Sequence, residues 1–165
     1  MKAPRAILAL LVGLFRASSA AEPASTDDET VAIVAVVQRF FDALHHKNGD
    51  ELRAVCQPGA QFTSGRARPE GCTLRQRPVE TAIAELATLK ETWLERMWTP
   101  TVQLNGRIAV VWTRYDFYRG GKFSHNGTDC FTLLKTDEGW KIVCGAYSVE
   151  PAAHTHHPSG APQKQ

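Results

Sequence analysis

The sequence predicts an α+β domain in which about three helices pack on a curved antiparallel sheet, made of a four-strand meander and a small strand pair. Apolar residues recur at helical spacing in the first half of the chain. From Glu95 to Glu150, β-type runs alternate with tight turns. With 165 residues, 43% hydrophobic and 22% charged, the composition is that of one soluble domain.

Capping residues and apolar spacing predict the helices. Thr26 and Glu29 form a capping box, and Asn48-Gly49 ends the apolar stripe that follows. Pro78 suits a first helical position. The expected helices cover residues 27–47, residues 50–55 and a segment that starts at Pro78 and carries Trp93 on its apolar side.

Turn signals predict the strands, because Asn-Gly and Gly-Gly pairs favour tight hairpins. The four runs of the meander are residues 95–104, 107–119, 122–135 and 140–150. The small strand pair combines residues 61–63 with residues 73–74. Residues 151–165 show no periodicity, so we expect a disordered tail there.

The strand that contains Pro100 has two possible registers. Counting through the preceding turn places Trp98, Val102 and Leu104 on the face away from the helices. Either Pro100 marks a bulge that resets the alternation, or this outer face is itself buried, as it would be in a dimer.

A two-residue turn at Gly120-Gly121 places polar side chains together on one face of the meander. Asp116 then lies opposite His125, and Arg114 lies diagonal to Asp129. The same face carries the larger apolar residues at its other end. We therefore assign it to the core beneath the helices.

This polar group has two interpretations. In the catalytic one, Asp116 orients His125, and Asp129 acts as a base held near Arg114. In the structural one, the same side chains form a cross-strand network that neutralises its own charges. The sequence favours the structural interpretation, because such networks are common without catalysis.

The candidate ligand-binding residues form a pocket wall in the functional interpretation and plain core in the alternative. They are Trp93, Trp112, Arg114, Tyr118, Phe131 and Trp140. We expect no cofactor. We also assign no metal site, because the histidines of the tail and of residues 45–46 lack a carboxylate or thiolate that would complete a rigid set.

Residues 1–21 have the pattern of a secretory signal peptide. Lys2 and Arg5 precede the apolar run Ala6–Phe15, and small residues follow at positions 17–21. The run is too short to span a bilayer, so we expect no membrane contact after cleavage. The alternative is an uncleaved anchor or a buried N-terminal helix. We expect a secreted or periplasmic protein whose domain covers residues 22–150.

The charge balance argues against a nucleic-acid partner. Lysine and arginine number 19 against 17 aspartate and glutamate residues, a net charge of +2. Removal of Lys2, Arg5 and Arg16 with the signal peptide leaves a mature charge of -1. A nearly neutral domain without a basic cluster lacks the electrostatic footprint of a nucleic-acid-binding protein.

Export allows disulfides to persist. Cys56 and Cys72 flank a segment rich in turn residues, and a bridge between them would stabilise the fold by roughly 3 kcal/mol. The alternative is a pair of buried free thiols. Cys130 and Cys144 are expected on opposite faces of the sheet, so we predict no bridge between them.

The order of elements and three segments together resemble the nuclear transport factor 2-like superfamily, in particular its SnoaL-like secreted or periplasmic members of uncharacterised function. The segments are residues 40–41 with 48–52, residues 124–133 and residues 139–143. The resemblance covers about residues 27–150. It implies a cone in which sheet and helices enclose an apolar pocket, and often a homodimer through the outer sheet face.

Three functions remain open, because this superfamily includes enzymes and binding proteins. The first is binding of a small, mostly apolar molecule in the cone. The second is a cofactor-free isomerase, dehydratase or hydrolase that uses Asp129 and His125. The third is a protein-interaction module that uses the outer sheet face.

Overall fold

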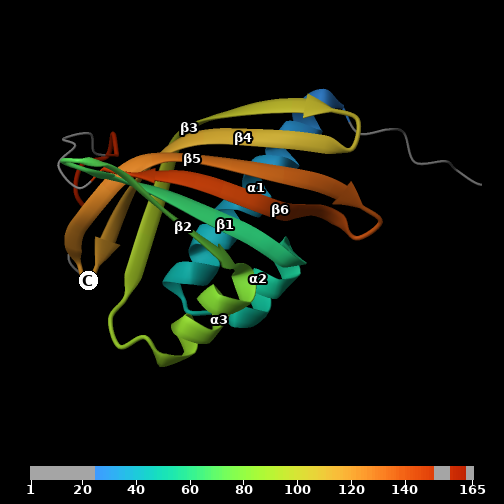
Figure 1. The fold of residues 1–165 in the computed structure, drawn as a ribbon. Coiled ribbons are helices and arrows are strands. Elements are labelled where there is room, and N and C mark those ends of the chain that lie inside the picture. The colour runs from blue at the N-terminus through green and yellow to red at the C-terminus, as the bar shows by residue number, and fades with distance from the viewer. Residues whose placement is uncertain (1–24, 151–156, 163–165) are drawn as a thin grey trace, which may run out of the picture.

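The computed structural model describes residues 25–150 and 157–162 (Figure 1). The helices are α1 (Thr26–His45), α2 (Gly49–Val55) and α3 (Val79–Thr88). The strands are β1 (Cys56–Arg68), β2 (Gly71–Pro78), β3 (Trp93–Asn105), β4 (Ile108–Arg119), β5 (Lys122–Thr136) and β6 (Gly139–Val149). The predicted signal peptide and residues 151–156 and 163–165 of the predicted tail lie outside the described residues. None of the helices within the described ranges is long and apolar enough to cross a membrane.

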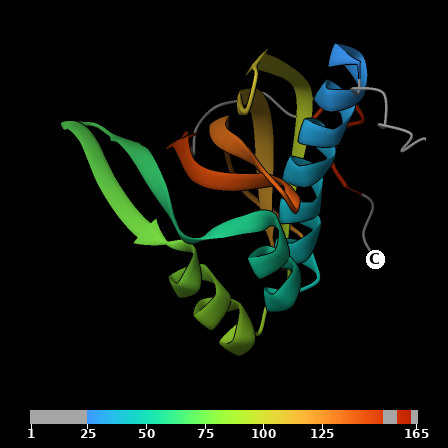
Figure 2. The ribbon, with the colours of Figure 1, turned by 90° about the vertical axis from the view of Figure 1, so that its right-hand side faces the viewer.

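One six-stranded sheet, ordered β2-β1-β6-β5-β4-β3, carries the three helices, so the α+β fold class is confirmed. The sheet is mixed, because β1 runs parallel to β6 while all other neighbours are antiparallel. The predicted strand pair is a long hairpin of β1 and β2. Figure 2 shows this hairpin bending away from α1, with α3 below its base.

Helix α1 packs its apolar face on the concave side of the sheet. Ile33, Val37 and Phe41 are almost completely buried there. Ser25, one residue before the predicted cap, accepts a hydrogen bond from the backbone of Asp28 and begins the helix. The predicted capping box at Thr26 is therefore wrong, although the helix itself is confirmed.

Glu29 in the first turn of α1 links the helix to β5 and β6. Its carboxylate accepts a hydrogen bond from Trp140 Nε1 at 2.6 Å and forms an ion pair with Lys135. Both contacts lower the pKa of Glu29. Trp140, a predicted ligand-binding residue, is therefore a core side chain beneath α1.

A bulge in β5 changes which side chains of β4 face the helices. The tight turn pairs Arg119 with Lys122 as predicted, but Ser124 has no partner and the register moves by one residue beyond it. A shift of one residue exchanges the two faces of a strand. The assignment is right for β5 beyond Ser124, but wrong for Phe123, which pairs with the outward Tyr118. It is also wrong for β4, whose inward side chains are Ala109, Val111, Thr113, Tyr115 and Phe117.

A second bulge, in β6, corrects the predicted positions of the later cysteines. Leu133 pairs with Ile142 as expected, but the register shifts before Thr132 pairs with Cys144. This shift places Cys144 on the same outer face as Cys130. Both thiols are free.

Of the two possible registers at Pro100, the structure has the one with a bulge. The β3 register shifts between Trp98 and Thr101, and Thr99 adopts a positive φ of 50°. Beyond this bulge, Val102 and Leu104 pack against the core, while Trp98 lies on the outer face. The predicted homodimer through the outer face stays a prediction.

The predicted bridge between Cys56 and Cys72 is wrong, and both are free thiols. Cys72 pairs with Ala67 near the tip of the hairpin, whereas Cys56 is buried at the opposite end of β1. Eleven residues of strand at about 3.3 Å each separate these ends, far more than the roughly 7 Å between Cα atoms that a disulfide allows. Burial raises the pKa of the Cys56 thiol to about 12.

The two registers of β4 predict opposite effects for neighbouring substitutions. Val111 is completely buried and Trp112 is 57% exposed. Val111→Ala should lower the free energy of unfolding by about 2 kcal/mol, since it leaves a cavity, and Trp112→Ala by less than about 0.5 kcal/mol. Urea unfolding followed by far-ultraviolet circular dichroism measures both. A larger loss from Trp112→Ala would support the unbulged register.

Candidate functional site

A cavity of about 350 Å³ lies between the inner face of the sheet and helices α1 and α3. Aromatic rings form its base. Phe40 stacks on Phe62 with ring centroids 5.1 Å apart, and Phe131 meets Phe40 edge-on at 5.6 Å. These rings join α1, β1 and β5. The volume of the cavity and its aromatic base suit a small organic molecule.

Three acidic residues line this cavity: Glu85 of α3, which is paired with Arg77, Glu95 of β3 and Asp129 of β5. Burial and the charge of Asp116 raise the pKa of Glu95 to about 8. Burial and the charge of Glu95 raise the pKa of Asp129 well above its usual range. Both shifts favour the protonated, uncharged carboxyl group over the carboxylate.

The remaining polar groups beside the acids are uncharged at neutral pH. Burial and the nearby charge of Arg66 lower the pKa of His125 to about 4, so its imidazole is neutral. Burial and the charge of Glu95 raise the pKa of Tyr115, whose hydroxyl donates to the Ser148 carbonyl at 2.7 Å. Net charge is thus absent from this part of the wall at pH 7.

Two polar atoms in the cavity wall have no hydrogen-bond partner among the described residues, Trp93 Nε1 and Asp129 Oδ2. Asp129 is 3% exposed. An unpaired buried donor or acceptor costs about 1–3 kcal/mol, so such atoms are rare in folded proteins. Both residues line the cavity.

Arginines form the rim of the cavity. Arg66, Arg75 and Arg77 come from the β1–β2 hairpin, and Arg119 comes from the end of β4. Arg77 is paired with Glu85 of α3, and Arg119 with Glu91 at 2.9 Å. Folding therefore brings together arginines that are far apart in the sequence and forms a basic cluster.

Residues 28–148 match a family model described as "Putative lumazine-binding". The chain belongs to this family. No curated protein sequence matches it. Similar solved structures include a nuclear transport factor 2-like superfamily protein from Salmonella enterica serovar Typhimurium, 16% identical with a TM-score of 0.61 over 81% of this chain and 99% of that one.

Two further structures show the same fold. A nuclear transport factor 2-like protein from Cytophaga hutchinsonii is 14% identical with a TM-score of 0.62, and covers 76% of this chain and 99% of that one. A protein of unknown function with a cystatin-like fold from Nostoc punctiforme is 11% identical with a TM-score of 0.60, and covers 79% and 96%. The resemblance to the nuclear transport factor 2-like superfamily is confirmed.

The predicted site residues divide between two faces of the sheet. The cavity is lined by Trp93, His125, Asp129 and Phe131. The outer face carries Trp112, Arg114, Asp116 and Tyr118. The β5 bulge causes this division, so the predicted placement of the four β4 residues in the pocket is wrong.

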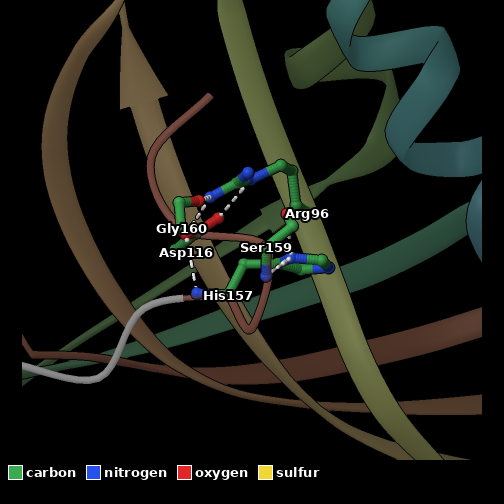
Figure 3. Close-up of polar contacts among 5 residues, drawn as sticks. All are labelled: Arg96, Asp116, His157, Ser159 and Gly160. Carbon is green, nitrogen blue, oxygen red and sulfur yellow. Dashed lines mark hydrogen bonds and ion pairs between the residues drawn. The ribbon is translucent and has the colours of Figure 1, made fainter. Parts of the chain in front are cut away.

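Asp116 therefore cannot orient His125, whose Nδ1 instead lies 2.9 Å from the Ser124 hydroxyl. Asp116 is completely buried on the outer face, where Arg96 donates two hydrogen bonds to its carboxylate at 2.9 and 2.6 Å. Figure 3 shows a turn of the chain completing this group. The His157 backbone donates to Asp116, and Arg96 donates to the Gly160 carbonyl. Residues 157–162, expected in a disordered tail, thus form an ordered contact.

The sequence analysis missed Glu95 and the arginine rim. Glu95 follows Trp93 by two residues in one strand, so the alternation of a strand places both on the same face. The prediction hid that signal, because it placed Trp93 on the helix that starts at Pro78. That placement is wrong, since α3 ends at Thr88 and Trp93 begins β3. The arginines gave no comparable signal, because their common face depends on the pairing of β1 with β2 and β6.

The raised pKa of Glu95 predicts a pH-dependent stability. A carboxyl group whose pKa is raised on folding stabilises the protein below its unfolded value of 4.5, and this contribution is lost as pH rises through about 8. The free energy of unfolding should fall from pH 6.5 to 8.5, and it should fall less in Glu95→Gln. Urea unfolding at the two pH values measures this.

The exposed carboxylate of Glu70 provides the matched control. Glu70→Gln makes the same chemical change at an exposed position and leaves the cavity intact, so it should keep the wild-type slope. Parallel curves for Glu95→Gln and the wild type would contradict the protonated state of the cavity acids.

Proposed function

We propose that this protein binds a small, mostly apolar molecule in the cavity between the sheet and helices α1 and α3. One observation carries the proposal. Trp93 Nε1 and Asp129 Oδ2 are buried and have no hydrogen-bond partner within the described ranges, and both residues line an aromatic-walled cavity. A bound molecule with one hydrogen-bond acceptor and one further polar group would satisfy both atoms.

The energetics of the fold favour a ligand-binding cavity over a part of the packed core. Protein interiors are close-packed, and an open volume forfeits the dispersion contacts that its lining would otherwise make. The cavity of about 350 Å³ and its unpaired polar atoms both destabilise the empty protein. Both features become favourable when a ligand fills the space.

The description of the family supports the same class of ligand. Lumazine is a planar heterocycle with polar edges, a shape that can stack against an aromatic ring of the cavity base such as Phe62. Its edge could accept from Trp93 Nε1. We therefore take planar heterocycles as the first compounds to test.

The raised pKa values of Glu95 and Asp129 favour a second candidate function, proton transfer to or from the bound molecule. A carboxyl group that titrates near neutral pH can act as general acid or base without a cofactor. This candidate covers isomerisation and dehydration, with Glu95 in place of the predicted partner Asp116. Chemical conversion of the ligand separates it from simple binding, and Asp129→Asn should abolish conversion, because an amide cannot transfer the proton.

We also propose that the chain is exported, on the signal pattern of residues 1–21. Expression of the full chain in a bacterial host should yield a periplasmic or secreted product that begins at Ala21 or Glu22 by intact mass. Retention of residues 1–21 in the recovered protein would contradict export by cleavage.

Narrowing the cavity should abolish binding. Ala82 of α3 lines the cavity, so the indole of Ala82→Trp would occupy the space of the ligand. N-phenyl-1-naphthylamine, a neutral aromatic probe whose fluorescence rises in apolar sites, should bind the wild type and bind Ala82→Trp at least about tenfold more weakly. Lumazine should displace the probe if the family description extends to this chain.

Ala87→Trp is the matched control, because Ala87 is exposed on the same helix. This variant should bind the probe as the wild type does. Equal binding by all three proteins would show that the probe occupies another site and would contradict the proposed pocket.

A further inference from the structure

We infer that the ligand of this cavity is an amphipathic anion, with an apolar body among the phenylalanines and an oxyanion such as a carboxylate held by Arg66 and Arg75. This inference rests on the proposed function and specifies the chemical class of its ligand. It requires that the two arginines share the face of the cavity, that their charges are free, and that no competing negative charge lies in the wall.

The pairing of strands places both arginines on the inner face of the hairpin. Ser64 of β1 pairs with Arg75 of β2 and with Tyr147 of β6, and all three line the cavity. Arg66 lies two residues beyond Ser64, so it projects from the same face. Phe62 lies two residues before Ser64, which makes the hairpin apolar at the base of the cavity and cationic at its rim.

The charges of Arg66 and Arg75 are available. Arg77 and Arg119, the other arginines of the rim, are each paired with a glutamate. Neither Arg66 nor Arg75 has a carboxylate within ion-pair distance in the part of the chain that the structure describes. Guanidinium groups bind oxyanions through paired, charge-assisted hydrogen bonds.

The deeper wall does not compete for these cations. Glu95 and Asp129 are the carboxyl groups that line it beyond the paired Glu85, and their raised pKa values favour the uncharged forms. His125 is neutral at the same pH. The cavity is therefore cationic at one end and uncharged at the other, which orients an amphipathic anion with its charge toward the hairpin.

Two probes that share an aromatic body but differ in charge show how much the negative charge of a ligand contributes to binding. The first is 8-anilinonaphthalene-1-sulfonate, which carries a sulfonate, and the second is N-phenyl-1-naphthylamine, which lacks it. Fluorescence titrations at low and high salt would use the wild type, the double variant Arg66→Gln/Arg75→Gln, and Arg114→Gln. Arg114 is an exposed arginine on the outer face, so its removal shows the effect of losing a positive charge away from the cavity.

The sulfonate probe should bind the double variant at least about tenfold more weakly than the wild type, and added salt should reduce that difference. The neutral probe should bind all three proteins equally, which also shows that the variants keep the fold. Arg114→Gln should bind both probes as the wild type does.

The outcomes distinguish this inference from the proposed function. If the neutral probe binds in a manner sensitive to Ala82→Trp but the double variant binds the sulfonate probe normally, the anion inference is wrong and the pocket stands. Equal weakening by Arg114→Gln, or equal weakening of both probes in the double variant, would also overturn it. Failure of both probes to bind in the cavity would overturn the proposed function itself.

Discussion

The stacked contact between Phe40 and Phe62 is the interaction on which the rest of this structure depends. It joins α1 to β1, and Phe131 of β5 closes the group edge-on. Gly145 of β6 makes room for it, since a Cβ there would lie 2.8 Å from Phe62 Cδ1 and 3.4 Å from Phe131 Cδ1. Because β6 presents only backbone at this point, β1 can lie beside it in parallel and the hairpin can bend away from the helix. The same rings then serve as the base of the cavity.

Stabilising and destabilising contributions to the free energy of folding lie close together around these rings. Each buried phenylalanine contributes roughly 1.5–3 kcal/mol through the hydrophobic effect. Beyond the base, the unpaired atoms of Trp93 and Asp129 and the protonated acids reduce stability. Such a division between a stable base and a costly polar wall is typical of sites that act on a ligand. The outer face differs in this respect, because the charges of Asp116 and Arg96 are satisfied by each other and by residues 157–160.

The sequence was sufficient to predict the fold class, the three helices and the four strands of the meander, because apolar periodicity and turn residues report local structure directly. It was insufficient wherever a bulge intervened. Ser124 looks like any other strand residue, yet its bulge moves Trp112, Arg114, Asp116 and Tyr118 from the predicted pocket to the outer face. The arginine rim of the cavity could not be predicted from neighbouring residues for a different reason. Arg66 and Arg75 meet at the cavity only through the long-range pairing of β1 with β6, which no nearby residue specifies.

A crystal structure of the protein grown with N-phenyl-1-naphthylamine would test the central claim, that the cone is a working binding site, most directly. The account predicts the probe between α1 and the sheet, with a ring against Phe62 and its amine near Trp93 or Asp129. Side chains filling the volume instead, with the probe absent or bound on the outer face, would contradict it. In that case the aromatic base would be plain core, and the search for function would move to the outer surface.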